Sequence, residues 1–216
     1  MTLLYLVRHA DHEFVGRGLA GRLDTPLNAD GCAQADRLAR WFARERVTAL
    51  WSSPLPRTRQ TAEPIAHALN LPVHTADELL EVDFGAWTGR DFADLDGDPL
   101  WRHWNGARSL ARVPGGESIA EVQTRMVGFI NRLCADDPEG NIVLVSHGDP
   151  IRAAIAYYLG VPVDLFLRIE VSPASISVLA IDGWTPRVLR LNGAVGNGNM
   201  GDSGNMGDDG SMAPAS

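Results

Sequence analysis

The chain has 216 residues, of which 45% are apolar and 21% are charged, ordinary values for a globular protein. This length suits one domain with a sizeable core. The formal net charge of −8 offers no basic face to nucleic acid or to an anionic membrane, and no apolar run is long enough to cross a bilayer. Two cysteines are too few for a disulfide scaffold, and no secretory signal is evident, so we expect a cytoplasmic protein.

The basic residues are unusual in kind. All 19 are arginine, and the chain contains no lysine. This excludes a Schiff-base lysine for pyridoxal phosphate and the lysine of a phosphate-binding P-loop. Any phosphate or carboxylate that binds here must be held by arginine, histidine or backbone N–H groups.

Strands and helices alternate in the first half of the chain. Leu3–Val7 is a continuous apolar run, typical of a strand buried on both faces. Asn28 is placed to cap a helix that runs to about Arg44. A weaker strand over Ala49–Ser52 and a helix over Arg57–Leu69 follow.

The second half repeats this alternation. Ser118 and Glu121 have the spacing of a capping box, which opens a helix ending near Cys134. Ile142–Val145 is another buried strand, and Pro150 suits the first turn of the helix after it. Together the elements predict an α/β fold, a three-layer sandwich with a mostly parallel central sheet.

The domain is predicted to end in a hairpin and then a tail. Ser175–Ile181 and Arg187–Leu191 have the pattern of two paired strands. We therefore assign residues 1–192 to one domain. Residues 193–216 are rich in Gly, Asn, Asp, Met and Ser and repeat Gly-Asn-Met-Gly-Asp, a composition that predicts a disordered tail.

Polar residues follow three of the predicted strands directly. Arg8 and His9 follow the first, Arg57 closes a Ser-Pro-Leu-Pro-Arg run after the second, and His147 follows Ile142–Val145. Since functional residues in parallel sheets lie at the carboxyl ends of strands, we expect these four side chains to converge. Two arginines can neutralise a phosphoryl dianion, and a neutral imidazole can act as a nucleophile.

The same region also offers candidate metal ligands. His9 and His12, with Asp11 and Glu13 nearby, have ligand types suitable for zinc. However, the neighbouring arginines would set positive charge against a cation, and the segment has the composition of a loop. We therefore predict that no metal and no cofactor is needed.

The chain resembles the histidine phosphatase superfamily, in the branch that includes cofactor-dependent phosphoglycerate mutases. The motifs that carry the resemblance lie in the family's order over residues 3–191: Leu6-Val7-Arg8-His9, Gly21-Arg-Leu-Asp-Thr-Pro-Leu27, Gly31-x-x-Gln34-Ala35, Ser53-Pro-Leu-x-Arg57-x-x-Gln60-Thr61-Ala62, Leu79-x-Glu81-x-Asp83-Phe84-Gly85-x-Trp87-x-Gly89, Gly115-Gly-Glu-Ser118 and Val145-Ser-His147-Gly148. The resemblance implies a phosphoglycerate mutase-like fold.

The resemblance also implies a role for each matching residue. His9 is the nucleophile that becomes phosphohistidine. Arg8, Arg57 and His147 hold the phosphoryl oxygens, and His147 belongs to the catalytic set. Glu81 protonates the leaving oxygen and then activates water, as general acid–base chemistry requires.

Three positions depart from the family pattern or leave a choice open. Ala10 stands where glycine is usual, and the following loop is one residue shorter and lacks the Asn and Gln that usually contact substrate. These differences leave the identity of the substrate undetermined, but they do not change the expected phosphoryl-transfer chemistry. Asp149, beside the second histidine, is an alternative candidate for the acid.

Residues 90–114 are least like the family. They hold several aromatic side chains and four arginines. This segment is either a surface insertion with its own small core or a lid over the leaving-group pocket, with Arg102 and Trp104 as candidate substrate contacts.

The function predicted is that of a metal-independent phosphatase that hydrolyses a small phosphorylated metabolite through phosphohistidine. A phosphoglycerate mutase and a non-enzymatic phospholigand-binding protein are the alternatives. We expect no nucleic acid or membrane partner, and the sequence names neither the substrate nor the oligomeric state.

Overall fold

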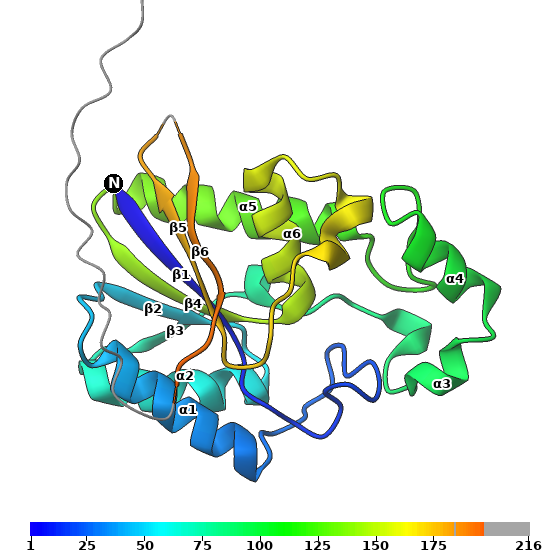
Figure 1. Ribbon diagram of the computed structural model, residues 1–216, viewed down its shortest axis with the longest axis horizontal. Coiled ribbons are helices and arrows are strands. Elements are labelled where there is room, and N and C mark those ends of the chain that lie inside the picture. The colour runs from blue at the N-terminus through cyan, green and yellow to red at the C-terminus, as the bar shows by residue number, and fades with distance from the viewer. Residues whose placement is uncertain (184, 197–216) are drawn as a thin grey trace, which may run out of the picture.

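A computed structural model describes residues 1–183 and 185–196 and contains one six-stranded sheet with helices on both faces (Figure 1). The strands are β1 (Thr2–Arg8), β2 (Ala49–Ser52), β3 (Val73–Thr75), β4 (Asn141–Ser146), β5 (Ile176–Ile181) and β6 (Arg187–Gly193). The α-helices are α1 (Ala29–Phe42), α2 (Pro56–Leu69), α3 (Phe92–Leu95), α4 (Pro99–Gly106), α5 (Ile119–Asp136) and α6 (Gly148–Leu159). Short 3-10 turns span Asp77–Leu79, Gly85–Trp87 and Val163–Arg168.

The strand order is β3-β2-β4-β1-β5-β6. Three of the five pairings are parallel, and the two that involve β5 are antiparallel. In the register of β1 with β4, Arg8 lies opposite Ser146, so both strands end at the same edge of the sheet. The predicted α/β sandwich with a mostly parallel sheet is therefore confirmed.

Each face of the sheet carries its own core. Figure 1 shows α1 and α2 on one side of the sheet and α5 and α6 on the other. Side chains of β1 alternate between the two cores: Leu4 and Leu6 pack with α5 and α6, whereas Tyr5 and Val7 pack with α1 and α2. Because both faces of β1 are buried in this way, its sequence is a continuous run of apolar residues.

The predicted helix starts are confirmed. The Asn28 side chain accepts a hydrogen bond of 2.8 Å from the Gly31 N–H, and Ser118 and Glu121 form a complete capping box. Pro150 lies in the first turn of α6. The first helix ends at Phe42, slightly before the predicted Arg44, and its last carbonyls accept from the following turn.

Three short elements escaped prediction: β3, α3 and α4. Figure 1 shows α3 and α4 set apart from the sheet, on the side toward which the loop after β1 also extends. Both belong to the 90–114 segment. At the other end, β6 runs to Gly193, and Val195 packs against the α1–α2 core. Residues 197–216 of the predicted tail lie outside the described residues.

Within the described part of the chain, none of the helices combines the length and apolarity needed to span a membrane.

Candidate active site

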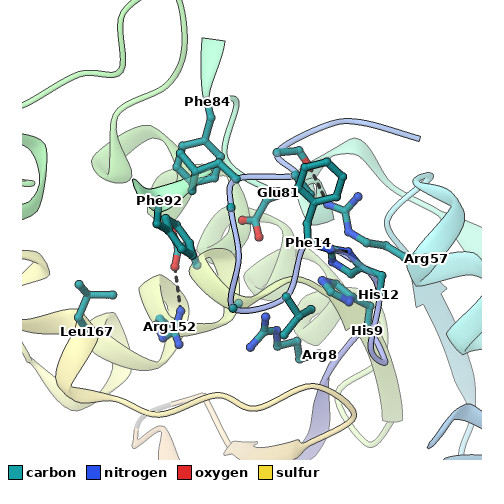
Figure 2. A pocket seen from close by; sticks show the side chains of 18 of the residues that line it. Arg8, His9, His12, Phe14, Arg57, Glu81, Phe84, Phe92, Arg152 and Leu167 are labelled. Carbon is teal, nitrogen blue, oxygen red and sulfur yellow. Dashed lines mark hydrogen bonds and ion pairs between the residues drawn. The ribbon is translucent and has the colours of Figure 1, made fainter. Parts of the chain in front are cut away.

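A cavity of about 280 Å³ opens at the edge where β1 and β4 end (Figure 2). Arg8, His9, Arg57, Glu81 and Asp149 all line it, although they come from distant points of the sequence. The structure therefore brings these five predicted side chains together, whereas His147 lies behind the cavity wall, beside the His9 ring.

His9 directly continues β1, and its backbone N–H donates to the carbonyl oxygen of Ser146 at 2.9 Å. Its Nδ1 lies 2.8 Å from the Ala10 carbonyl oxygen, which can only accept a hydrogen bond. Nδ1 therefore carries the ring proton, and Nε2 keeps a free lone pair. Burial and the charges of Arg57 and Arg8 hold the pKa of His9 well below its usual range, so the imidazole is neutral.

The two arginines are held by backbone carbonyls at their terminal nitrogens. Arg8 Nη1 donates to Val171 at 2.7 Å. Arg57 Nη1 and Nη2 donate to Leu23 and Gly21 at 3.0 and 2.6 Å. Burial is the main cause that lowers the pKa of Arg57, to about 10, which leaves it positively charged at neutral pH. In both arginines the buried Nε has no hydrogen-bond partner in the described chain.

His147 is fully buried, and its ring centroid lies 5.1 Å from that of His9. Its Nε2 is 2.9 Å from the Ser53 hydroxyl, and its Nδ1 has no partner among the described residues. With the hydroxyl as donor, Nδ1 carries the proton and can donate it to an anion. Burial and the charge of Arg57 keep the pKa of His147 well below its usual range.

The three unpartnered nitrogens thus belong to Arg8, Arg57 and His147, and a helix N-terminus adds to them. Helix α6 begins at Gly148, which lines the cavity and has no side-chain cap before it. A Cβ at Gly148 would lie 3.5 Å from Arg8 Nε, so the start of α6 and the Arg8 guanidinium are neighbours. Buried donors without acceptors, together with a helix N-terminus, fit a tetrahedral oxyanion.

Glu81 reaches the cavity from the irregular segment after β3. Burial is the main cause that raises its pKa to about 7, and the charge of Asp149 adds to it, while the Val82 N–H, Arg57 and Arg8 act in the opposite direction. Its Oε1 accepts from the Val82 N–H at 2.9 Å. A carboxyl group with such a pKa is partly protonated at neutral pH and can serve as an acid.

Asp149, the alternative acid, has a different environment. Its carboxylate forms an ion pair of 3.0 Å with Arg152, and Figure 2 marks this contact with a dashed line. The ion pair engages the Asp149 carboxylate, whereas the Glu81 carboxyl group accepts from the backbone N–H of Val82. The geometry favours Glu81.

Segment 90–114 both packs its own aromatic cluster and lines the cavity. The Trp87 ring meets the Trp101 and Trp104 rings edge to face, with centroids 5.4 and 6.1 Å apart. Trp104 also lines the cavity. Arg102 is exposed and is not part of the cavity wall, to which this segment contributes Arg108. Arg102 lies on α4, whereas Arg108 lies in the turn that follows this helix.

Two further residues were not assigned a role from the sequence. Thr61, in the Ser53–Ala62 motif, accepts from the Ala10 N–H at 3.0 Å and donates to the Arg57 carbonyl at 2.7 Å, so it ties the loop after His9 to α2. His12 was considered only as a metal ligand. Its buried ring lies 4.9 Å from the His9 ring and lines the cavity.

The metal alternative finds no support in side-chain positions. The Asp11 carboxylate accepts from the Asn28 amide at 3.1 Å, at the start of α1. Among the described residues, no group of three or more His, Cys, Asp or Glu side chains is arranged to hold a metal ion.

Comparison with known proteins extends this description. The sequence profile of the histidine phosphatase superfamily (branch 1) matches residues 4–194. Phosphoserine phosphatase 1 of Hydrogenobacter thermophilus is 37% identical over 196 residues, which are 89% of this chain and 92% of that protein. A probable phosphoglycerate mutase of Proteus mirabilis is 36% identical over 185 residues, 82% of this chain and 84% of its own length.

A solved phosphatase structure is also similar to this chain in fold. Mycobacterial glucosyl-3-phosphoglycerate phosphatase superposes with a TM-score of 0.80 at 28% identity, covering 89% of this chain and 99% of that one. The profile match spans nearly the whole described chain, and the relatives exceed 30% identity over most of their length. The chain therefore belongs to branch 1 of the histidine phosphatase superfamily.

Proposed function

We propose that this phosphomonoesterase transfers the phosphoryl group of a small metabolite to Nε2 of His9 and then to water. One observation carries the proposal: three unpartnered buried nitrogens surround a neutral histidine whose Nε2 lone pair is free. Such donors stabilise negative charge as it develops on the phosphoryl oxygens, without reorganising at the moment of reaction.

In the first step His9 Nε2 attacks phosphorus, and the bond from phosphorus to the ester oxygen breaks. Arg8, Arg57 and His147 hold the three remaining oxygens. Glu81 gives its proton to the departing oxygen, which leaves as an alcohol. The raised pKa of Glu81, about 7, supplies this proton near neutral pH.

In the second step water attacks the phosphorus of phosphohistidine, and the phosphorus–nitrogen bond breaks. Glu81, now a carboxylate, accepts a proton from this water. Inorganic phosphate leaves, and both His9 and Glu81 return to their starting states. The same arginines serve both steps, so the site needs no divalent cation to balance the phosphoryl charge.

The names of the relatives suggest the first substrates to test. Phosphoserine and 3-phosphoglycerate are small enough for a cavity of about 280 Å³. Hydrolysis releases inorganic phosphate, whereas a mutase converts 3-phosphoglycerate into its 2-isomer without net release. Both reactions can be followed in one assay.

The test uses purified protein after prolonged exposure to EDTA, with phosphate release measured from each substrate. We expect release to continue at an unchanged rate. Loss of activity that zinc or magnesium restores would contradict the metal-free mechanism. Isomerisation without release would establish the mutase, and binding without turnover would establish a phospholigand-binding protein.

A further inference from the structure

Arg108 is a buried cation that forms no ion pair in the described chain, although the charges of Asp149 and Asp164 act on it from beyond ion-pair distance. It lies in the loop after α4, is 3% exposed, and lines the same cavity as His9. Its Nη2 donates to the Asn105 side-chain oxygen at 2.5 Å, but Nε and Nη1 have no hydrogen-bond partner among the described residues. No carboxylate oxygen of the described residues lies within ion-pair distance of it.

Two aromatic rings hold the Arg108 guanidinium in place but do not accept hydrogen bonds from its Nε and Nη1. Its guanidinium carbon lies 5.2 Å from the Trp104 ring centroid and 4.8 Å from that of Phe166. Ring faces attract a cation but accept no full hydrogen bond. The nearby Asp164 carboxylate is engaged elsewhere, because the Ser109 N–H and hydroxyl donate to it at 2.8 and 2.7 Å.

A second unpartnered donor lies on the same wall. The indole nitrogen of Trp104 is fully buried and has no acceptor in the described chain. The other arginine on this side, Arg152, is neutralised by Asp149. Figure 2 places Phe92, from the same segment, across the cavity from His9, so this wall faces the phosphoryl site.

We propose that Arg108, aided by the Trp104 indole N–H, forms a second anion subsite that binds a carboxylate of the substrate. A guanidinium with no ion pair and two unused N–H donors can take one carboxylate, whereas the phosphoryl dianion already has two arginines of its own. The substrate class is therefore a small phosphomonoester that also carries a carboxylate. This inference rests on the proposed function, because it assumes that the ester occupies the Arg8–Arg57 site.

Two matched substrate pairs test the subsite in the wild-type enzyme. Phosphoserine differs from phosphoethanolamine by its carboxylate, and 3-phosphoglycerate differs from glycerol 3-phosphate by replacement of an alcohol with a carboxylate. Losing a hydrogen bond to a charged group weakens binding about 10- to 100-fold. We expect kcat/KM to favour the carboxylated member of at least one pair by this factor, and equal values within both pairs would overturn the proposal.

Variants locate the effect at Arg108. Arg108→Gln should abolish the preference for the carboxylated substrate, so that the two members of each pair are hydrolysed with kcat/KM values within about threefold of each other. Trp104→Phe, which keeps an aromatic ring and removes the N–H, should reduce the preference less.

Arg102→Gln is the matched control: it removes an arginine of the same segment that lies outside the cavity, and it should preserve the wild-type ratio. A preference retained in Arg108→Gln, or lost equally in Arg102→Gln, would contradict the assignment.

The outcomes separate this inference from the proposed function. Hydrolysis of all esters without carboxylate preference refutes the subsite alone. If no ester is hydrolysed, the proposed function fails, and calorimetry with the same pairs still measures carboxylate selectivity. If Arg108→Gln does not fold, the substrate pairs in wild type and Trp104→Phe decide the matter.

Discussion

At the scale of single residues, the proton on Glu81 is set by opposing influences. Burial and the charge of Asp149 favour the protonated form, and the Val82 N–H together with the charges of Arg57 and Arg8 favour the carboxylate. The balance raises the pKa from the ordinary 4.5 to about 7. The nearby His9 is shifted the other way, so near neutrality an acid and a neutral nucleophile coexist.

This balance predicts a pH profile. For an alkyl phosphate, kcat/KM should fall as pH rises above about 7, because Glu81 loses the proton that the leaving oxygen needs. In Glu81→Gln this falling limb should disappear, and the rate should be about 10²–10⁴-fold lower than that of the wild type below pH 7, with a smaller difference at higher pH. Steady-state kinetics between pH 5 and 9 measure both effects. A falling limb that persists in Glu81→Gln would assign it to another group, and Asp149→Asn would then be the variant to examine.

Several residue assignments could be predicted because they follow from strand ends. Arg8, His9 and His147 come directly after buried apolar runs, so parallel pairing alone brings them to one edge. Glu81 had no such signal. It lies on an irregular segment after the three-residue strand β3, and only its resemblance to the family motif pointed to it.

At the scale of elements, helix α5 holds the segment that carries Glu81. The contact is made by the Arg125 side chain with the backbone of this segment and not with the Glu81 carboxyl group. Arg125 Nη1 and Nη2 donate to the carbonyl oxygens of Glu78 and Glu81 at 2.6 and 3.2 Å. Its Nε also pairs with Glu117 at 3.1 Å. Arg22 Nε adds a hydrogen bond of 3.3 Å to the Glu81 carbonyl, so the segment is held at its backbone.

Arg125→Gln should therefore affect both stability and the acid. We expect a loss of about 2 kcal/mol in the free energy of unfolding, because hydrogen bonds of a charged group contribute roughly 1.5–3 kcal/mol. We also expect hydrolysis of an alkyl phosphate to fall more than that of p-nitrophenyl phosphate, whose leaving group needs no proton. Urea titration and steady-state kinetics measure the two effects.

A matched control lies further along the same helix. Arg132 forms an exposed ion pair with Glu78, and exposed pairs contribute little, at most about 1 kcal/mol. Arg132→Gln should leave the ratio of alkyl to aryl rates unchanged. If Arg125→Gln lowers both rates equally, its role is structural and does not involve positioning Glu81.

Prediction at this scale succeeded for long elements and failed for short ones. Capping residues and apolar periodicity located α1, α2, α5 and α6, whereas β3 has three residues and α3 has four. In segment 90–114 part of the cavity wall follows helical spacing. Trp101, Trp104 and Asn105 are spaced at i, i+3 and i+4 on α4, whereas Arg108 lies in the turn beyond the end of the helix at Gly106, and no periodic pattern places it in the wall.

At the scale of the whole molecule, the fold explains why one end of the sheet carries the chemistry. The order β2-β4-β1 is parallel, so the segments after all three strands meet at a single edge. The segment after β3 and the wall formed by α3 and α4 close the cavity from the other side. The architecture was predictable from alternation and family motifs, whereas the cavity's volume and its unpaired donors depend on side-chain packing that no sequence pattern specifies.

The central claim, that the phosphoryl group passes through His9 with Glu81 as proton donor and acceptor, is tested most directly by rapid-quench trapping. Glu81→Gln is mixed with p-nitrophenyl phosphate, which can phosphorylate the enzyme without an acid, and the quenched protein is analysed for acid-labile phosphate. We predict that phosphoenzyme accumulates on His9, because water attack lacks its base, and that none forms in Glu81→Gln when His9→Ala is added. Turnover of p-nitrophenyl phosphate without any phosphoenzyme, or phosphate recovered on another residue, would contradict the account.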